Sequence, residues 1–203
     1  MSTLPQPTKE LYHNIRAEVI GLHYRVKILR QLFTSQEIVD LLNKTAFRFF
    51  TTLRYDLLDT IVLAINRLLD PAKTFNRYPN ASLQQLIDQI DIPENAASVA
   101  KLRDTLCQIK CKSHRLENWR DKWAGHRDLD VLLGNAPLPA ISLVEVDEVL
   151  VLLQSFMNEF EETFQDPLEE VNLYGKTDAD VKEIAKNLQL RIPSPTDYGN
   201  MCY

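Results

Sequence analysis

The residues best suited to chemistry are Arg120 and His126, which five residues separate near the end of a basic stretch. A guanidinium group is a permanently charged, planar fork that matches phosphate oxygens. An imidazole, with an ordinary pKa of about 6.5, accepts or donates a proton near neutral pH. The pair therefore offers a phosphate-binding cation and a proton carrier.

These two side chains converge only if the helix between them ends. In a straight α-helix, six steps of about 100° each place Arg120 and His126 on different faces. Gly125 directly precedes His126, and glycine most readily adopts the left-handed conformation that ends helices. We therefore expect the helix that carries Arg120 to end in a left-handed cap at Gly125.

Apolar residues recur at three- and four-residue steps along most of the chain, which is the pattern of helices that bury one face. The predicted helices cover residues 9–33, 34–70, 82–92, 94–124 and 142–164, with capping-box patterns at Thr34, Ser82 and Ser142 and a minor helix at 177–188. Residues 71–80 are predicted to form a polar loop, and no strand pattern is found. The sequence thus predicts an all-α, antiparallel bundle of four to five helices over residues 1–170, followed by a minor helix and an extended or disordered tail over 171–203.

The predicted helix over residues 94–124 has an unusual apolar stripe. The stripe consists of Leu102, Leu106, Ile109, Ser113, Leu116, Arg120 and Trp123. Arg120 shares the face of the leucines, whereas a solvated arginine normally lies on the opposite face. We expect Arg120 to meet a partner, a pocket or an interface, and the alternative is an arginine that extends from the helix end into water.

Composition excludes several classes of protein. A chain of 203 residues with 45% hydrophobic and 25% charged residues suits one soluble domain. Neither a secretion signal nor the roughly 20 apolar residues of a membrane span is found. The three cysteines form no disulfide framework, so a cytoplasmic location is the simplest expectation.

Charge is unevenly distributed along this acidic chain, whose net charge is −5. Residues 101–127 contain eight Lys and Arg and three acids, whereas residues 128–175 contain eleven acids and no Lys or Arg. This separation favours a local positive surface that attracts nucleic acid. The alternative is that the two segments pack together and neutralise each other.

Several motifs resemble a known family. Arg120 and Asp121, followed by His126, resemble the Arg-x4–6-His motif of the HEPN superfamily, in which a polar residue typically follows the arginine. Three earlier motifs resemble the abortive-infection branch of bacterial HEPN proteins: Ala46, Phe49 and Phe50; Arg67, Asp70 and Pro71; Asn80, Ser82 and Leu83. The resemblance implies an all-α and usually dimeric protein. Many HEPN proteins are metal-independent ribonucleases that act as toxins or phage-defence effectors, whereas others have lost catalysis and serve as binding modules.

Within the ribonuclease hypothesis, His126 is the general acid or base, and Arg120 binds phosphate and stabilises the transition state. Asp121 orients Arg120 or His126 by hydrogen bonding. Cleavage needs a base for the 2′-hydroxyl and an acid for the departing oxygen, but one chain supplies one histidine in this motif. A two-fold homodimer would bring two of each residue into one cleft, as the resemblance also implies. The expected product carries a 2′,3′-cyclic phosphate.

The flanking residues suggest secondary roles and partners. Arg115, Lys122 and Arg127 are expected to hold RNA phosphates, which positions a strand without reading its sequence. Trp119 and Trp123 are expected in the core of the bundle or of a dimer, and the alternative is that they stack on an unpaired base. The expected partners are RNA, a second copy and an antitoxin protein, with no cofactor, metal or membrane.

Two alternatives remain open on the sequence. One is a catalytically inactive HEPN module that binds protein, nucleotide or RNA. The other is a metal site at Cys107, Cys111 and His114, which lie on one face of a continuous helix but lack a fourth ligand. Asp128 has a competing interpretation as a helix cap rather than a reacting group.

Overall fold

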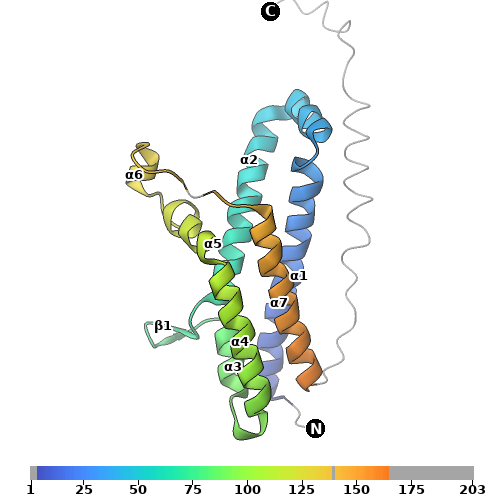
Figure 1. The fold of residues 1–203 in the computed structure, drawn as a ribbon, viewed down its shortest axis with the longest axis vertical. Helices are drawn as coiled ribbons and strands as arrows, with labels where there is room; N and C mark the ends of the chain where they lie inside the picture. Colours follow the sequence, from blue (N-terminus) through green and yellow to red (C-terminus); the bar gives the residue numbers. More distant parts are fainter. Residues whose placement is uncertain (1–3, 139, 165–203) are drawn as a thin grey trace, which may run out of the picture. The chain divides into compact units, whose positions relative to one another are not determined.

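A computed structural model describes residues 4–138 and 140–164. Its α-helices are α1 (Gln6–Phe33), α2 (Gln36–Leu69), α3 (Leu83–Ile90), α4 (Ala96–Lys112), α5 (His114–Trp119), α6 (Leu129–Leu132) and α7 (Leu143–Phe164), shown in Figure 1. A 3-10 turn, η1 (Pro93–Asn95), precedes α4, and a π-helical turn, η2 (Arg120–Ala124), follows α5. The predicted all-α class is confirmed, and the predicted segment 171–203 lies outside the described residues.

The chain divides into two compact units, each of which contains parts of α1 and α2. The described part of the first unit comprises residues 4–23, 59–138 and 140–164, and it contains all the predicted site residues. The described part of the second unit comprises residues 24–58.

The first unit is built around the packing of α4 against α7. The predicted apolar line of α7 is buried from Val146 to Phe160, together with Val149 and Phe156. The Tyr12 ring of α1 stacks on Phe160 with ring centroids 4.7 Å apart, and its hydroxyl donates to Glu161. Aromatic stacking and helix-face burial thus hold the termini of the described chain together.

The second unit is a helical hairpin with its own apolar cluster. Leu32 and Leu42 are buried in it, and Phe50 and Leu53 pack against them. The Thr34 hydroxyl donates to the Arg30 carbonyl at 2.6 Å, so Thr34 ends α1 rather than capping α2, contrary to the prediction. The predicted continuous helix over residues 34–70 is also interrupted, because Ala46 has φ −159° and ψ 69°.

The segment predicted to be a polar loop contains a small β-hairpin. Strands β1 (Lys73–Thr74) and β2 (Tyr78–Pro79) are antiparallel, with Lys73 opposite Pro79 and Thr74 opposite Tyr78. Two-residue strands are too short to show an alternating pattern in the sequence, which explains why they were not expected.

The predicted capping boxes at Ser82 and Ser142 each show one of the two hydrogen bonds that the motif predicts. The buried Ser82 hydroxyl accepts from the Gln85 amide at 3.3 Å. The Ser142 hydroxyl accepts from the Val144 amide at 3.2 Å, and Glu145 accepts from the Ser142 amide at 3.2 Å. Both helices therefore begin with amides satisfied by side chains.

Loss of the α3 cap should measurably weaken the fold. Ser82→Ala leaves the Gln85 amide without its acceptor, and such substitutions lower the free energy of unfolding by about 1 kcal/mol. Urea unfolding followed by circular dichroism measures this difference. Ser98→Ala, inside α4, is the matched control and should be neutral or slightly stabilising, because alanine is the better helix former. Equal stability of Ser82→Ala and the wild type would contradict the role of this cap.

Candidate functional site

The helix that was expected over residues 94–124 is divided into several elements. It begins as η1, continues as α4, and is interrupted at Ser113, whose φ of −88° and ψ of 2° are not helical. The Ser113 hydroxyl donates to the Lys110 carbonyl at 3.2 Å. Leu116 is nevertheless fully buried, so the predicted apolar stripe continues across the break. The break at Ser113 separates α4 from α5 and from η2, the turn that carries Arg120.

A π-helical turn brings Gly125 onto Arg120. The Gly125 amide donates to the Arg120 carbonyl at 2.7 Å, a bond that spans five residues instead of the usual four. A Cβ on Gly125 would lie 3.1 Å from that carbonyl oxygen and 3.5 Å from Arg120 Cγ. His126 therefore follows directly the residue that lies against Arg120.

Gly125 does not adopt the predicted left-handed cap. Its φ of −87° and ψ of −35° are right-handed, so the prediction was wrong about how the helix ends. Glycine is suited to this position for another reason, because a side chain would crowd the Arg120 carbonyl. The wider turn of the π-helix replaces the cap that the sequence suggested.

Acidic side chains surround the Arg120 guanidinium. Its Nε and Nη2 atoms both lie 2.7 Å from Asp121 Oδ1, and Nη2 lies 3.6 Å from Glu117 Oε1. The hydrogen bond that Arg120 donates to the Asp121 carboxylate is the main cause that raises the pKa of Arg120, and the charges of nearby carboxylates add to it. Arg120 is half-buried, and its guanidinium binds carboxylates of its own chain. The hydrogen bond to Asp121 fixes the orientation of the guanidinium.

Arg120 also lines a polar pocket of about 240 Å³. The other lining residues are Asn66, Leu69, Asp70, Lys110, Ser113 and Glu117. Burial raises the pKa of the Asp70 carboxyl, and the Arg120 and Arg67 charges oppose this rise. The pocket thus combines the cations Lys110 and Arg120 with the Asp70 carboxyl, whose ionised form is disfavoured by burial.

Replacing Asp70 tests this electrostatic arrangement. A raised pKa means that ionisation of Asp70 opposes folding, so its neutral form is the better tolerated one. Wild type should therefore lose stability relative to Asp70→Asn as the pH rises from below 3.8 through the raised pKa. Urea unfolding of both proteins at acidic pH and at pH 7 measures the change. If the difference in unfolding free energy between wild type and Asp70→Asn stays constant with pH, or shifts in favour of wild type as the pH rises, the raised pKa of Asp70 is contradicted.

His126 and Arg127 lie exposed after the π-helical turn. Among residues 4–138 and 140–164, no hydrogen bond or ion pair is recorded for His126. Arg127 lies over the Trp123 ring, 3.9 Å from its centroid, which is a cation–π contact. An accessible imidazole therefore follows the turn, one residue after the Gly125 amide that is bonded to the Arg120 carbonyl.

Asp128 acts as a helix cap. Its carboxylate accepts from the Val131 amide at 3.1 Å, which is the main cause that lowers the pKa of Asp128. Its own amide donates to the Lys122 carbonyl at 3.1 Å, and its carboxylate lies 3.6 Å from Lys122 Nζ. The interpretation of Asp128 as a cap is therefore confirmed, and this residue holds the loop that carries His126 against η2.

The two tryptophans have different environments. Trp119 is buried, and its indole nitrogen donates to Asp59 at 2.9 Å, which fits the predicted core position. Trp123 is half-buried, with its ring 6.4 Å from that of Trp119. Asp59 of α2 thus contacts the segment before Arg120, and it accepts a hydrogen bond from Trp119.

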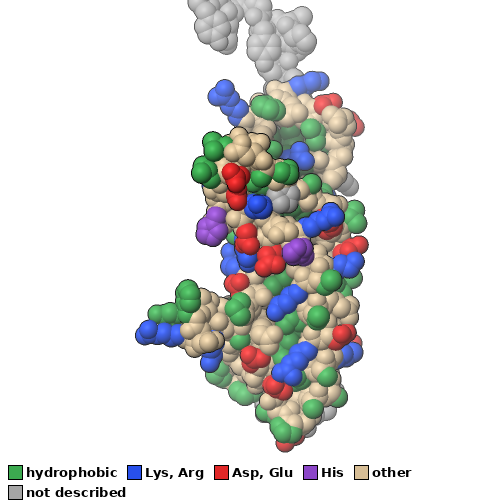
Figure 2. Space-filling model, turned by 60° about the vertical axis from the view of Figure 1, so that its left-hand side comes forward, with side chains coloured by type: hydrophobic (Ala, Val, Ile, Leu, Met, Phe, Trp, Pro, Cys, Tyr) green, Lys and Arg blue, Asp and Glu red, His purple; other side chains and the backbone are tan. Residues whose placement is uncertain are grey.

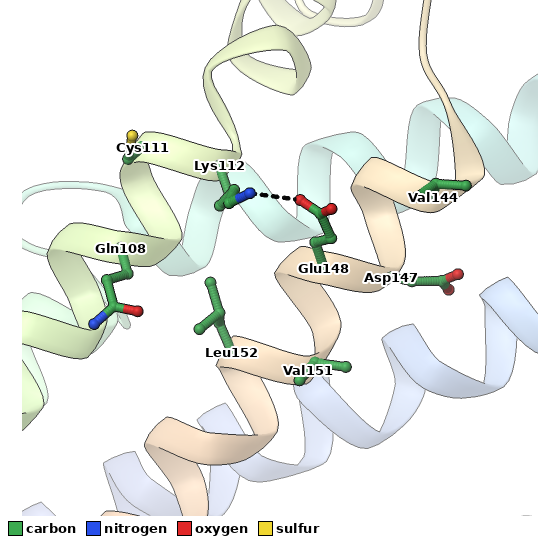
Figure 3. Close-up of a pocket in the computed structure, with 8 residues that line it drawn as sticks. All are labelled: Gln108, Cys111, Lys112, Val144, Asp147, Glu148, Val151 and Leu152. Carbon is green, nitrogen blue, oxygen red and sulfur yellow. Dashed lines mark hydrogen bonds and ion pairs between the residues drawn. The ribbon is translucent and has the colours of Figure 1, made fainter.

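Acids on α7 neutralise much of the basic segment. Arg115 lies 2.8 Å from Glu145, and Lys112 lies 2.9 Å from Glu148 (Figure 3). The face shown in Figure 2 accordingly has acidic and basic side chains interleaved rather than one basic patch. Among the predicted RNA-binding residues, Arg115 and Lys122 are both ion-paired, and Arg127 contacts Trp123. The structure therefore favours the alternative that the two segments pack together.

The structure does not place Cys107, Cys111 and His114 on one face of a continuous helix, as the alternative metal site required. Cys107 and Cys111 are exposed on α4, whereas His114 belongs to α5 beyond the break at Ser113. In the part of the chain that the structure describes, no three His, Cys, Asp or Glu side chains cluster closely enough to hold a metal ion. Cys111 instead lines an apolar groove of about 510 Å³ between α4 and α7 (Figure 3).

Sequence reasoning missed three residues around Arg120. Asp70, Lys110 and Glu117 join it in the pocket, although they precede it by very different distances along the chain. Glu117 was predictable, because residues three apart on a helix are neighbours. Asp70 occurs in one of the motifs that resemble abortive-infection HEPN proteins, but only the packing of the end of α2 places it near Arg120.

The model of the family described as AbiU2 (HEPN_AbiU2) matches residues 5–182. The chain belongs to this HEPN family. Significant matches were found neither among characterised proteins nor among solved structures.

Membership of the AbiU2 family confirms the resemblance to the abortive-infection branch of HEPN proteins. It also agrees with the all-α architecture, and it supports a HEPN-type module in abortive infection. None of the helices among the described residues is both long and apolar enough to cross a membrane.

Proposed function

We propose that this AbiU2-family protein is a metal-independent endoribonuclease whose active site forms between two copies of the chain. The observation that carries the proposal is the π-helical turn, which places exposed His126 directly after the residue that lies against Arg120. Asp121 orients the guanidinium through a 2.7 Å hydrogen bond. Arg120, the phosphate-binding fork, thus begins a hydrogen-bonded turn, and His126, the proton carrier, directly follows the residue that closes it.

The proposed reaction is a transesterification that needs no metal. His126 of one copy accepts the proton of the RNA 2′-hydroxyl, whose oxygen attacks the adjacent phosphorus. Arg120 stabilises the extra negative charge on the phosphorane. His126 of the second copy donates a proton to the departing 5′-oxygen. The bond to that oxygen breaks, and a 2′,3′-cyclic phosphate and a 5′-hydroxyl result.

An apolar surface next to His126 supports the requirement for two copies. Leu129 and Leu132 of α6 and Leu133, which follows it, are 67%, 54% and 65% exposed, and their three- and four-residue spacing places them on one side of this turn. Exposed clusters of large apolar side chains are characteristic of interaction surfaces. A second copy that covers α6 would bring its own Arg120 and His126 to the same region.

The second candidate function is a catalytically inactive module that binds another protein, including an antitoxin, a nucleotide, or RNA that it does not cut. Two observations favour it. Carboxylates of Asp121 and Glu117 already occupy the Arg120 guanidinium, and Arg115 and Lys122 are ion-paired. The ribonuclease hypothesis requires an RNA phosphate to compete with these ion pairs, which are all at least partly accessible to solvent and therefore individually weak.

Incubation of the purified protein with mixed RNAs in excess EDTA separates the two functions. The ribonuclease hypothesis predicts cleavage that EDTA leaves unchanged and products that end in 2′,3′-cyclic phosphate, detected by mass spectrometry. RNA that stays intact with and without EDTA, while the protein forms a stable complex with a partner, would support the inactive module. Cleavage that EDTA abolishes would contradict the metal-independent mechanism.

A further inference from the structure

We infer that the β-hairpin of residues 73–79 is a binding element for single-stranded RNA, an inference that rests on the proposed ribonuclease function. Figures 1 and 2 show this hairpin standing out beside α3 and α4, with basic and hydrophobic side chains at its end. Its residues are exposed throughout. No function was expected for this segment, which was predicted to be a polar loop.

The hairpin alternates cations with aromatic rings. Phe75 is 90% exposed and Tyr78 is 57% exposed, and Arg77 lies over the Tyr78 ring, 5.3 Å from its centroid. No ion pair is recorded for Lys73 or Arg77 among the described residues. Residues 71–81 contain no acid. Proteins bind single strands by stacking bases on aromatic side chains and by attracting phosphates with cations, and this hairpin presents both.

The backbone presents Phe75 in a conformation that is unfavourable for it. Phe75 and Asn76 have φ values of 51° and 53°, and the Arg77 amide donates to the Thr74 carbonyl at 3.1 Å. Hairpin turns with two left-handed residues normally use Asn, Asp or Gly there, and a bulky residue in this region is strained. The Phe75 backbone is strained and its ring is exposed, so this residue contributes little to folding. This combination indicates a role in binding.

A hydrogen-bond network holds the hairpin in shape. The Asn80 amide group donates to the Pro71 carbonyl at 2.8 Å and to the Thr74 hydroxyl at 2.9 Å. The Asn80 backbone amide donates to the Ala72 carbonyl at 2.9 Å. The rings and cations are thus presented by an ordered hairpin, which limits the conformational entropy lost when a ligand binds.

The hairpin begins next to the candidate site. Pro71 directly follows Asp70, which lines the same pocket as Arg120 and Lys110. A strand bound on the hairpin would therefore continue toward the arginine that is proposed to bind the reacting phosphate. The unpaired cations of the hairpin also supply the positive surface that the ion-paired Arg115 and Lys122 do not. Single-stranded RNA fits this charge better than an apolar protein surface does.

Binding is measured by fluorescence anisotropy with a labelled single-stranded RNA, in a His126→Ala background so that cleavage does not interfere. Phe75→Asn removes the ring and places a suitable residue in the turn, so the fold should not weaken, but affinity should fall about tenfold. The double variant Lys73→Gln/Arg77→Gln should lower the magnitude of the slope of log affinity against log salt by about 1.4, because each lost phosphate contact contributes about 0.7 on a single strand. Phe47→Gln and Lys44→Gln, which remove an exposed ring and an exposed cation from α2, should bind like the parent.

The outcomes separate the hairpin from catalysis. The inference is supported if the hairpin variants bind RNA more weakly and the α2 controls do not, even if the protein never cuts RNA. Unchanged RNA binding by those variants overturns it, whether or not they lose a protein partner and whether or not the protein is a ribonuclease. An equal loss in the α2 controls, or no RNA binding by the parent, overturns it as well.

Discussion

His126→Ala is expected to lower the rate of RNA cleavage by a factor of about 10² to 10⁴, the usual contribution of a positioned acid or base. His126 is exposed, and no hydrogen bond or ion pair is recorded for it among the described residues, so its removal should leave the fold intact. Single-turnover cleavage of a labelled RNA measures the effect, and circular dichroism verifies the fold.

His114→Ala is the matched control for this histidine. His114 is also exposed, on the neighbouring helix α5, and lies 3.9 Å from Glu117. Its removal should leave the cleavage rate within about twofold of wild type, because the proposed mechanism gives it no proton to transfer. Equal rates for wild type and His126→Ala, or an equal loss in His114→Ala, would contradict the role of His126.

Arg120→Ala is expected to reduce cleavage by about 10² to 10³, comparable to the loss of a donor that stabilises a transition-state anion. Arg120→Lys should remain well below wild type, because lysine keeps the charge but lacks the planar fork that Asp121 orients. The rate at saturating RNA distinguishes this loss from weaker binding.

Arg103→Ala is the appropriate control for Arg120. Arg103 is an exposed arginine paired with Asp91 at 2.6 Å, on a helix that precedes the site. Its replacement should leave the maximal rate unchanged, since exposed ion pairs contribute little. An Arg120→Lys variant with full activity would show that a positive charge alone suffices, which would contradict the role given to Asp121.

Helix faces were predictable from the sequence because apolar spacing is a local signal. The buried line of α7 and the caps at Ser82 and Ser142 agree with the prediction. Helix interruptions were not predictable in this way. The apolar stripe passes through Ser113 without a change of spacing, so nothing in the sequence marked the break between α4 and α5. The local spacing of apolar residues therefore predicts which segments form helices better than it predicts where each helix begins and ends.

The surroundings of Arg120 and Arg115 could not be predicted from the sequence, because they are formed by contacts between segments that are distant in the chain. The ion pair between Arg115 and Glu145 requires α7 to pack beside α4, and the approach of Asp70 requires the end of α2. The sequence placed Arg120, Asp121 and His126 together in one motif. It did not reveal that a π-helical turn, instead of a left-handed glycine, would bring Gly125 onto Arg120.

Mixing wild-type chains with His126→Ala chains tests the two-copy active site most directly. At equal amounts, with free exchange verified by native mass spectrometry, about one quarter of the dimers contain two intact histidines. If both histidines are needed, the mixture should retain about one quarter of the activity of an all-wild-type sample of the same total concentration. Retention of about one half, or protein that stays monomeric while it cuts RNA, would contradict the account.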